Sequence, residues 1–537
     1  MTAASASHPA APRRPGLVLT ALLLAAVVCN VNFAAAGVAL PDIGVSFTAS
    51  QTQLDLVGLG TGLGLAMSVL YFGAIADRYG RTQLLVLGLL LTVVASAVSA
   101  TAPSIEVLIG ARVFTGLAAG MAYPTTLSLI TALWAEGPGR TRAIALWASI
   151  GGMAIVAGGV VAGAVLAVST WNAAFLLSVP VAIVAVLLII AVVPSHVGES
   201  ADPVDHQGGV LSVVGVAALV IGTGVVLAPG SGVVGAVLLA AAVVVIALFL
   251  RRQATARFPL FDLQVARRRL FWVPALAGTI AFGSLIGAMF VGEQFMQNVL
   301  GYTPLDAGAA VVPAAVGLLA VAPLSAGLLA RRGSRTTMLL GYALVAGAFL
   351  SMLGWREGTP YALIGLGYLL IGAGAAFIIT ASSRSLTSST PVRRVGMASA
   401  TSDLQNDLGG SIMQALLGAV LAGGFAASFA RSIAESQEAG EVSAEVTAAL
   451  QSSFASAARV AAQHPELEQQ ILEAARQSLV AGSLAAYLVG AVAILLGAGV
   501  VWFGLPSRTA EAALRERYAA SDLRDEQPRR TIRPADA

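Results

Sequence analysis

The chain has 537 residues, of which 57% are hydrophobic and only 11% are charged, whereas an average soluble domain is roughly 25% charged. A mean hydropathy of +0.85 excludes a water-soluble enzyme, and a net charge of +3 with no basic cluster beside aromatic residues gives no support for nucleic-acid binding. A single cysteine, Cys29, excludes a disulfide framework and a cysteine-based metal cluster, and the four histidines all lie outside apolar runs. The sequence therefore predicts a membrane protein that holds no metal and no cofactor.

Long apolar runs, punctuated by glycine, proline and arginine, follow one another along the chain. A helix needs about 20 apolar residues to cross a bilayer, so we expect an all-α integral membrane protein. Fourteen spans are predicted, at residues 17–40, 53–76, 83–102, 105–134, 143–166, 173–194, 210–228, 232–250, 271–299, 307–330, 336–354, 359–382, 395–425 and 478–504.

The first apolar run, from Leu17 to Leu40, follows two arginines and so has the outline of a secretory signal peptide. It is longer than the roughly 7 to 15 residues of a signal core, and more spans follow, so an uncleaved first span is the better interpretation. With the N-terminus in the cytoplasm, 25 of the 30 arginines fall in cytoplasmic segments, 4 in outer segments and one, Arg112, inside a span. This asymmetry follows the positive-inside rule, and an even number of spans then predicts that both termini lie on the cytoplasmic side of the inner (cytoplasmic) membrane.

Three stretches outside the spans have distinct patterns. Residues 251–270 hold six arginines, which suit a connection lying against anionic headgroups, although topology alone also explains them. Residues 430–476 form an outer loop with seven glutamates and three arginines, in which apolar residues recur every fourth position. This pattern predicts an amphipathic helix, or a hairpin with a second helix after Pro465, and the alternative is a partly ordered solvated loop. The arginine-rich tail after Pro506 predicts disorder.

A glycine-rich, charged turn connects the second and third predicted spans. Its glycines allow close approach, and its charges can pair with a neighbouring helix end. Residues 73–81 resemble the G-x-x-x-D-R-x-G-R signature of the major facilitator superfamily, and every fixed position is matched by Gly73, Asp77, Arg78, Gly80 and Arg81. The resemblance implies that these residues form a conformational gate, in which Asp77 and Arg81 latch the two halves of the protein when the cytoplasmic side is closed.

A weaker copy of this signature covers residues 327–335, with arginine in place of aspartate and one residue missing. The copies start 254 residues apart, about 32 residues for each of eight spans, which fits two six-span halves separated by two extra helices. The implied domains are a cytoplasmic N-terminal tail (1–16), an N-terminal six-helix bundle (17–194), two inserted helices with linkers (195–270), a C-terminal six-helix bundle that includes the outer loop (271–504) and a cytoplasmic tail (505–537).

Further matches narrow the resemblance to the 14-spanner drug:proton antiporters of the quaternary-ammonium and multidrug efflux type. They include Ala-Leu-Pro at residues 39–41 and the run from Gln297 to Gly308. Residues 108–116 resemble the L-x-x-x-R-x-x-x-G pattern of the superfamily as a whole. Arg112, inside the last pattern, adds about 2.5 to 3.5 kcal/mol to insertion, so we expect it to face the bundle interior with a partner. It either fixes helix packing or stabilises a proton-carrying carboxylate.

Two positions depart from the antiporter pattern. Where family members often have an acidic residue in the first span, this chain has Asn32, so one proton or cation site is missing. In the fifth span the family's G-P-x-x-x-G becomes Gly158, Gly159 and Gly163, with glycine in place of proline. These small residues still allow close helix crossing, but the kink that proline imposes is not guaranteed.

Carboxylates deep within spans are the candidates for proton coupling. Acids in loops are not candidates, and neither are the acids at span ends, which are Asp42, Asp55 and Glu106. Three carboxylates remain, Glu293, Asp403 and Asp407. Glu293 lies in the ninth span, nearer the outer face, where a vestibule carboxylate is the alternative interpretation.

The other two, Asp403 and Asp407, lie in the thirteenth span. Their i,i+4 spacing places them on one helix face, about 6 Å apart along the axis. Burial and mutual repulsion disfavour ionising both, so one of them can hold a transferable proton. The alternative is that they bind neighbouring hydroxyls or pair with Arg112 or Arg384.

Together these features predict proton-coupled export of hydrophobic or cationic amphipathic drugs across the cytoplasmic membrane by alternating access. The expected partners are a small amphipathic substrate, protons and membrane lipids, with no nucleic acid, and the expected state is a monomer. One alternative is a lipid or endogenous-metabolite exporter of the same fold, which the missing first-span acid favours. A second is a non-transporting membrane sensor or scaffold. An enzyme is not expected, because the predicted spans hold no histidine or cysteine cluster.

Overall fold

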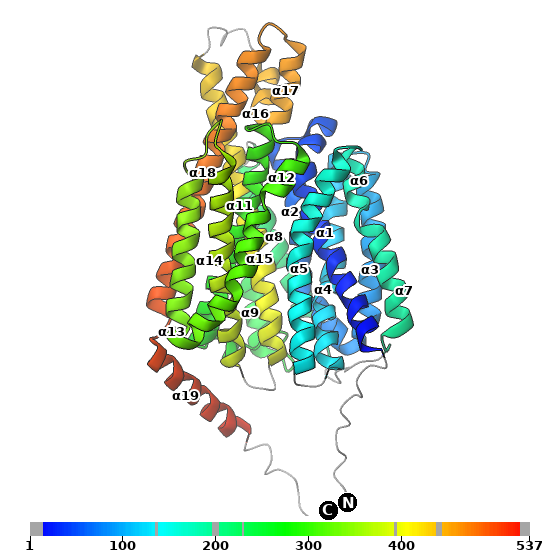
Figure 1. The fold of residues 1–537 in the computed structure, drawn as a ribbon, viewed down its shortest axis with the longest axis vertical. Coiled ribbons are helices and arrows are strands. Elements are labelled where there is room, and N and C mark those ends of the chain that lie inside the picture. The colour runs from blue at the N-terminus through cyan, green and yellow to red at the C-terminus, as the bar shows by residue number, and fades with distance from the viewer. Residues whose placement is uncertain are drawn as a thin grey trace, which may run out of the picture.

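The computed structural model describes residues 14–134, 138–195, 203–227, 230–390, 395–435 and 443–526. Nearly all of these residues are helical, and no strand occurs among them. The long helices run roughly side by side, as Figure 1 shows. The prediction of an all-α membrane fold is therefore confirmed.

By length and composition, twelve helical segments of the described chain can cross a membrane. One of them, the 49-residue segment Pro304–Met352, comprises α12 (Pro304–Ala310) and α13 (Val312–Met352) and leaves helical geometry at Gly333, where φ is +81°. Glycine adopts this φ without steric penalty. The predicted spans 307–330 and 336–354 therefore lie within one helical segment, and the chain turns between them at Gly333. The helix α5 (Pro138–Leu166) is not among the twelve, so the total of fourteen spans stays a prediction.

The first seven helices pack together, and we call them the first bundle (Figure 1). Glycines let α2 and α4 approach closely: a Cβ atom on Gly64 would lie 2.1 Å from the carbonyl oxygen of Val113, and one on Gly116 would lie 2.1 Å from that of Thr61. A core of mainly small and aliphatic side chains joins α1, α3, α4, α5 and α7 in this bundle. The helices of the first bundle are α1 (Pro15–Phe47), α2 (Gln51–Tyr79), α3 (Arg81–Ala100), α4 (Ile105–Leu133), α5, α6 (Trp171–Leu176) and α7 (Ser178–Val192).

A second bundle forms from the later helices and has an aromatic core. The ring of Trp355 meets the rings of Tyr368 and Tyr487 edge to face, with centroids 5.8 and 5.7 Å apart. Such pairs are favourable beyond the apolar area that they bury. The helices of the second bundle are α11 (Arg269–Asn298), α12, α13, α14 (Tyr361–Ser388), α15 (Val395–Glu435) and α18 (Glu468–Gly504).

Two further helices, α8 (His206–Val225) and α9 (Gly232–Thr255), pack on each other. The first of them also contacts α2 and α15, so the pair lies beside both bundles. Asp205 caps α8 by accepting a bond from the backbone of Gly208, and it forms an ion pair with Arg252 at 3.0 Å, which ties the ends of the two helices together. The short helix α10 (Leu263–Ala266) then leads into α11.

One end of the molecule is covered by two short helices, α16 (Ala444–Ser452) and α17 (Phe454–Gln463), and we call it the cap end (Figure 1). The cap is fixed to the first bundle, since the hydroxyl of Ser453 donates to the carbonyl oxygen of Ala49 at 2.8 Å and Arg459 donates to that of Val45 at 2.6 Å. The helix expected after Pro465 is the beginning of α18, which packs against α17.

At the opposite end, which we call the terminal end, α1 begins and α18 stops (Figure 1). Here the prediction of a disordered tail is wrong, because α19 (Arg508–Glu526) is a helix. Its Glu511 is buried and accepts bonds from the backbone and hydroxyl of Ser334, at 3.1 and 2.6 Å. The high charge content of the tail concealed a helix that docks through such contacts. Residues 527–537 lie outside the described part.

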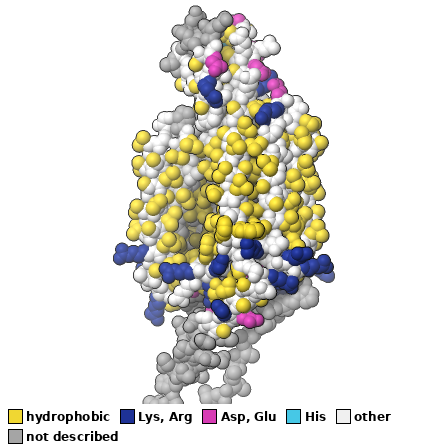
Figure 2. Space-filling view, turned by 90° about the vertical axis from the view of Figure 1, so that its left-hand side faces the viewer, with side chains coloured by type: hydrophobic (Ala, Val, Ile, Leu, Met, Phe, Trp, Pro, Cys, Tyr) yellow, Lys and Arg dark blue, Asp and Glu magenta, His cyan; other side chains and the backbone are white. Residues whose placement is uncertain are grey.

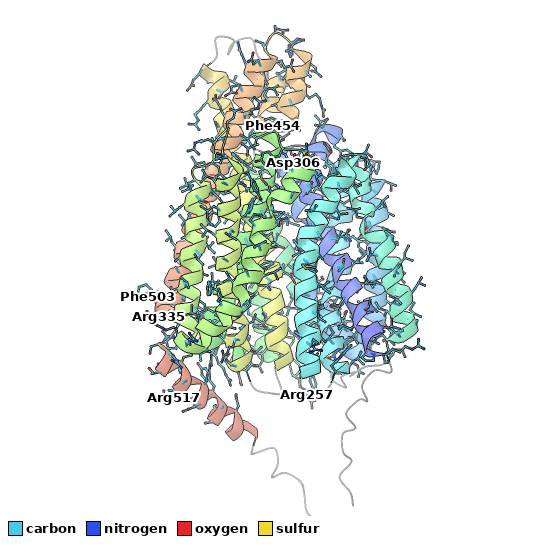
Figure 3. All side chains as sticks on the ribbon, viewed as in Figure 1. Arg257, Asp306, Arg335, Phe454, Phe503 and Arg517 are labelled. Atoms are coloured by element: carbon cyan, nitrogen blue, oxygen red, sulfur yellow. The ribbon has the colours of Figure 1, made fainter. Side chains whose placement is uncertain are left out.

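Charges are distributed unequally between the two ends. Figure 2 shows a face whose middle is covered by hydrophobic side chains, with arginines gathered towards the terminal end and acidic side chains beside a few arginines at the cap end. Figure 3 shows Arg257, Arg335 and Arg517 at the terminal end, and Asp306 and Phe454 at the cap end. An apolar belt with charged borders is what a protein embedded in a bilayer requires.

Candidate functional site

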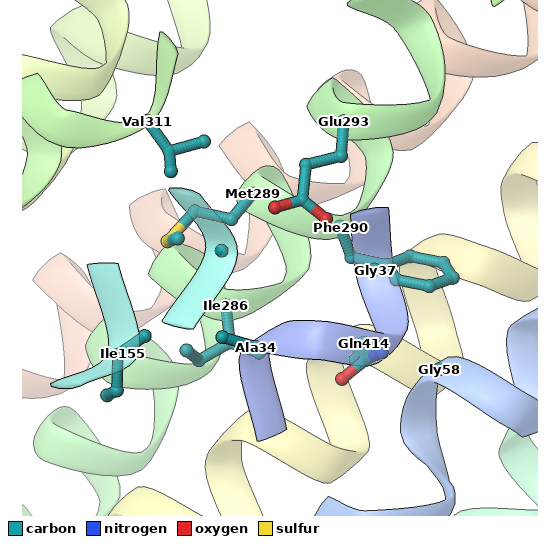
Figure 4. Close-up of a pocket in the computed structure, with 11 residues that line it drawn as sticks. Ala34, Gly37, Gly58, Ile155, Ile286, Met289, Phe290, Glu293, Val311 and Gln414 are labelled. Carbon is teal, nitrogen blue, oxygen red and sulfur yellow. The ribbon is translucent and has the colours of Figure 1, made fainter. Parts of the chain in front are cut away.

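A cavity lies between the two bundles (Figure 4), with room of about 50 Å3 for the centres of water-sized molecules. Its walls are apolar or glycine except for one carboxylate and one amide, those of Glu293 and Gln414. The lining residues come from α1, α2, α5, α11 and α15 and from the junction of α12 with α13; they are Ala34, Gly37, Gly58, Ile155, Gly159, Ile286, Met289, Phe290, Glu293, Val311 and Gln414.

Glu293 reaches this cavity from α11 and is only 8% exposed. Its carboxylate lies against the backbone of α1, where a Cβ atom on Gly37 would come within 2.0 Å of Oε2, so a side chain at residue 37 would displace the carboxylate. Within the described chain, no hydrogen bond and no ion pair to Glu293 is found, and Tyr368 lies within electrostatic range of it. Because ionising a buried carboxylate without a cation or donors is expensive, this group is suited to exchanging a proton for a cation.

A second buried carboxylate, which the sequence analysis set aside as a span-end acid, lies closer to the cap end. Asp55 on α2 is only 2% exposed, and its Oδ1 accepts a bond of 2.8 Å from the amide of Gln51. The same amide donates to Oε1 of Gln294 on α11 at 2.6 Å, and a Cβ atom on Gly418 of α15 would lie 3.0 Å from the carboxylate. The i,i+4 pair Gln51 and Asp55 was visible in the sequence, but its burial depends on α11 and α15.

Arg112 and Asn32 lie together inside the first bundle. Arg112 is 1% exposed, donates to the backbone carbonyl of Asn32 at 2.6 Å and lies over the ring of Phe175, 4.9 Å from its centroid. The amide of Asn32 donates to Ser178 at 2.7 Å and accepts from Ser96 at 3.3 Å. The arginine therefore faces the bundle interior as expected, and its partners among the described contacts are a carbonyl group and an aromatic ring.

The two aspartates of the thirteenth predicted span lie on α15. The side chain of Asp403 is outside the described part of the structure. Asp407 is partly buried and interacts electrostatically with Cys29 of α1, so it faces the first bundle. The structure thus does not place Asp407 among the residues that line the cavity of Glu293.

The segment expected to form a turn, residues 73–81, is instead the last part of α2, Gly80 and the first residue of α3, and it holds an ion pair within the first bundle. Arg81 contacts Asp77 at 2.8 Å and donates to the carbonyl of Ser128 at 3.4 Å. Gly80 has a φ of +117°, which favours glycine, whereas Gly73 has open space around it. Arg78 takes part in further interactions.

The three glycines of α5 lie at close helix crossings. A Cβ atom on Gly158 would lie 3.1 Å from the Cα atom of Val31 on α1, and one on Gly163 would lie 2.6 Å from that of Leu305 on α12. Gly159 also faces α12 and lines the cavity. These small residues let α5 contact both bundles.

Direct contacts join the two bundles near the cap end. Besides the packing of α5 on α12, the amide of Gln297 on α11 donates to the carbonyl of Val38 on α1 at 3.3 Å. The bond between Gln51 and Gln294 joins α2 to α11 in the same region. At this end, therefore, the bundles are closed over the cavity.

Comparison with known proteins identifies the family. A family model described as Major Facilitator Superfamily matches residues 22–414. The chain belongs to this superfamily. It is therefore a transporter rather than an enzyme, and the family predicted from the motif at residues 73–81 is confirmed.

Curated relatives in this superfamily are named as drug efflux proteins. The chain is 32% identical over 403 residues to the multidrug efflux pump LfrA of Mycolicibacterium smegmatis, covering 75% of this chain and 80% of that one. It is 30% identical over 401 residues to the multidrug resistance protein Stp of Mycobacterium tuberculosis, covering 74% and 73%. It is 27% identical over 405 residues to the methyl viologen resistance protein SmvA of Salmonella typhimurium, covering 74% and 81%.

Solved structures share the fold at low sequence identity. The inward-facing, unoccupied structure of a bacterial homologue of the human lysosomal transporter Spinster superimposes with a TM-score of 0.61 at 17% identity, covering 91% of this chain and 98% of that one. The nucleoside transporter NupG gives a TM-score of 0.57 at 11% identity, covering 91% and 100%. Both likenesses concern the fold alone.

Proposed function

We propose that this transporter exports hydrophobic or cationic amphipathic drugs in exchange for protons. The observation that carries the proposal is the apolar cavity between the two bundles, which has the single buried carboxylate of Glu293 in its wall. An apolar site with one acid suits flat or flexible organic cations. The relatives named as multidrug efflux and methyl viologen resistance proteins support the same substrate class.

The orientation that we propose places the terminal end in the cytoplasm and the cap end outside the inner membrane. The unequal distribution of arginine along the sequence supports it, since positive charge is retained on the cytoplasmic side. In this orientation both chain termini are cytoplasmic. The closed cap end then corresponds to a conformation that receives substrate from the cytoplasm.

Coupling follows from competition for the Glu293 carboxylate. In the buried cavity the carboxylate is neutralised either by a proton or by a cationic substrate, because a bare buried charge is unfavourable. The two ligands therefore exclude each other, and the protein changes conformation with one or the other bound. Each proton that enters down a potential of 100 mV supplies about 2.3 kcal/mol for export.

We assign further roles within the same proposal. Asp407 and Asp403 are second candidates for carrying a proton, because they share one face of α15. The pair of Asp77 and Arg81 gates the terminal end, where Arg81 holds the turn against α4. Arg112, which donates to the carbonyl of Asn32 inside the first bundle, acts in transport rather than in the stability of that bundle.

The test is dye accumulation in inverted membrane vesicles with a pH gradient, using ethidium as the probe. Glu293→Gln is expected to lose at least tenfold in gradient-driven accumulation, because the cavity then has no group to protonate. Glu106→Gln is the matched control, since Glu106 is an exposed glutamate at the cap end of α4, and it is expected to accumulate dye like the wild type.

Three results would contradict parts of the proposal. Unchanged accumulation in Glu293→Gln removes this residue from the coupling step, and Asp407→Asn then tests the second candidate. Accumulation that needs no pH gradient contradicts proton coupling. Absence of dye transport, combined with altered membrane lipids in a deletion strain, favours the lipid exporter instead.

A further inference from the structure

Asp55, like Glu293, is a described carboxylate that lies buried where the two bundles meet near the cap end. Its Oδ1 accepts a bond from Gln51 on its own helix, and its Oδ2 has no hydrogen-bond partner in the described structure. The neighbouring Gln294 on α11 also has an unbonded Nε2. These groups are sealed because α2, α11 and α15 close around them.

The described surroundings of Asp55 contain no cation. From its own helix it meets the amide of Gln51, from α11 the amide of Gln294, and from α15 the backbone of Gly418. The nearest carboxylate along α11 is Glu293, one residue before Gln294, and its side chain turns to the backbone of Gly37 on α1. No charged group therefore compensates an ionised Asp55 while the cap end is closed.

Opening the cap end separates α2 from α11 and α15 and admits water to Asp55. In water an aspartate is ionised at neutral pH, whereas in the closed arrangement only the amides of Gln51 and Gln294, and no described cation, lie near its charge. Closing and protonation are therefore linked: the carboxylate takes up one proton from water at the cap end before the bundles close over it. When the cap end reopens, the acid returns that proton to the same side.

We propose that Asp55 is a proton-dependent lock on the cap end, holding it closed when protonated and favouring its opening when ionised. This inference rests on the proposed alternating access but not on the identity of the substrate. Because Asp55 binds and releases its proton on one side, it moves no charge across the membrane. It sets the pH at which the protein resets, and Glu293 remains the group that exchanges a proton for cargo.

The direct test measures the distance between the bundles at the cap end. Spin labels are attached to Val168→Cys and Tyr361→Cys, two exposed cap-end positions on the first and second bundle, in a Cys29→Ala background. The distance between the two labels is measured by pulsed electron–electron double resonance in nanodiscs from pH 5.5 to 8.5. In the otherwise wild-type protein we expect the ratio of open to closed populations to rise with pH, by at most tenfold per pH unit for one linked proton.

Asp55→Asn is expected to keep the closed distance, with a population ratio that changes less than twofold over the whole pH range. Asp55→Ser provides a second uncharged replacement if the asparagine variant does not fold, and Asp42→Asn is a control at an exposed acid of α1. A wild-type pH response in both Asp55 variants overturns the proposal. So does a wild-type distance that is insensitive to pH.

A transport measurement separates this inference from the proposed function. In wild-type vesicles that accumulate ethidium, acidifying the cap side is expected to speed turnover, and Asp55→Asn is expected to flatten this dependence at least fivefold over two pH units. If wild-type vesicles accumulate no dye, the proposed function fails and the distance measurement still decides the role of Asp55. Dependence on cap-side pH that is equal in the variant and the wild type contradicts the lock.

Discussion

Gly37 offers the sharpest test of the Glu293 site, because one methyl group reaches the carboxylate there. A Cβ atom on residue 37 would lie 2.0 Å from Oε2 and 3.1 Å from Cδ of Glu293, so in Gly37→Ala the carboxylate has to retreat by about 1 Å. A χ rotation of about 30° achieves this and costs about 0.5 to 1.5 kcal/mol. Alanine in place of glycine favours the helix by about 1 kcal/mol, so the two effects on stability nearly cancel.

Transport is expected to respond differently from stability. A misplacement of about 1 Å at a reacting group can slow a reaction about 100-fold, so we expect gradient-driven ethidium accumulation to fall at least tenfold in Gly37→Ala. Thermal unfolding, followed with a thiol-reactive dye on the buried Cys29, is expected to change little. In Gly372→Ala the new Cβ atom would lie 1.9 Å from the carbonyl oxygen of Ala314, a backbone atom, so this variant is expected to lose about 1 to 3 kcal/mol of stability.

Gly110→Ala completes this series, because nothing lies within 4 Å of a Cβ atom at that position. It is expected to gain up to about 1 kcal/mol of stability from the helix preference of alanine and to keep transport. Wild-type accumulation in Gly37→Ala would refute the assignment of Glu293, since the carboxylate cannot stay where it is beside an alanine. A large loss of stability in the same variant would show that the side chain has no room to rotate.

Two further substitutions test the other buried charges. Arg112→Met is expected to keep the unfolding temperature of the protein or raise it, because apolar replacement of a buried charged group is often neutral or stabilising. The guanidinium of Arg112 is buried with one bond to Asn32, one aromatic ring and an unbonded Nε. Transport is expected to be lost, and a destabilisation above about 3 kcal/mol would instead indicate a packing role. Glu511→Ala removes the acceptor of two bonds from Ser334, each worth about 1.5 to 3 kcal/mol when charge-assisted, so α19 is expected to undock and be cleaved faster in limited proteolysis. The exposed Glu516→Ala is the control, and equal cleavage of both variants would show that Glu511 does not hold the helix.

Local patterns in the sequence were sufficient for the class of fold and the family. Apolar runs of span length predict helices in a bilayer whatever their neighbours are, and the turn from Gly73 to Arg81 can be read from one short segment. Positive-inside asymmetry needs only the order of arginines along the chain. For the same reason the sequence located the break at Gly333, where glycine and charge interrupt an apolar run.

Burial of single side chains between helices was decided by the tertiary structure. Asp55 stands near the start of its helix, a position that is usually solvated, and it is buried because α11 and α15 lie over it. Asp407 shows the opposite relation between sequence and structure, because it is central in its predicted span but does not line the cavity of Glu293. Likewise α19 is a charged segment whose helix depends on the turn that receives Glu511. A sequence records spacing along one chain, whereas the environment of an ionisable group depends on which distant helices pack against it, and the sequence does not state that packing.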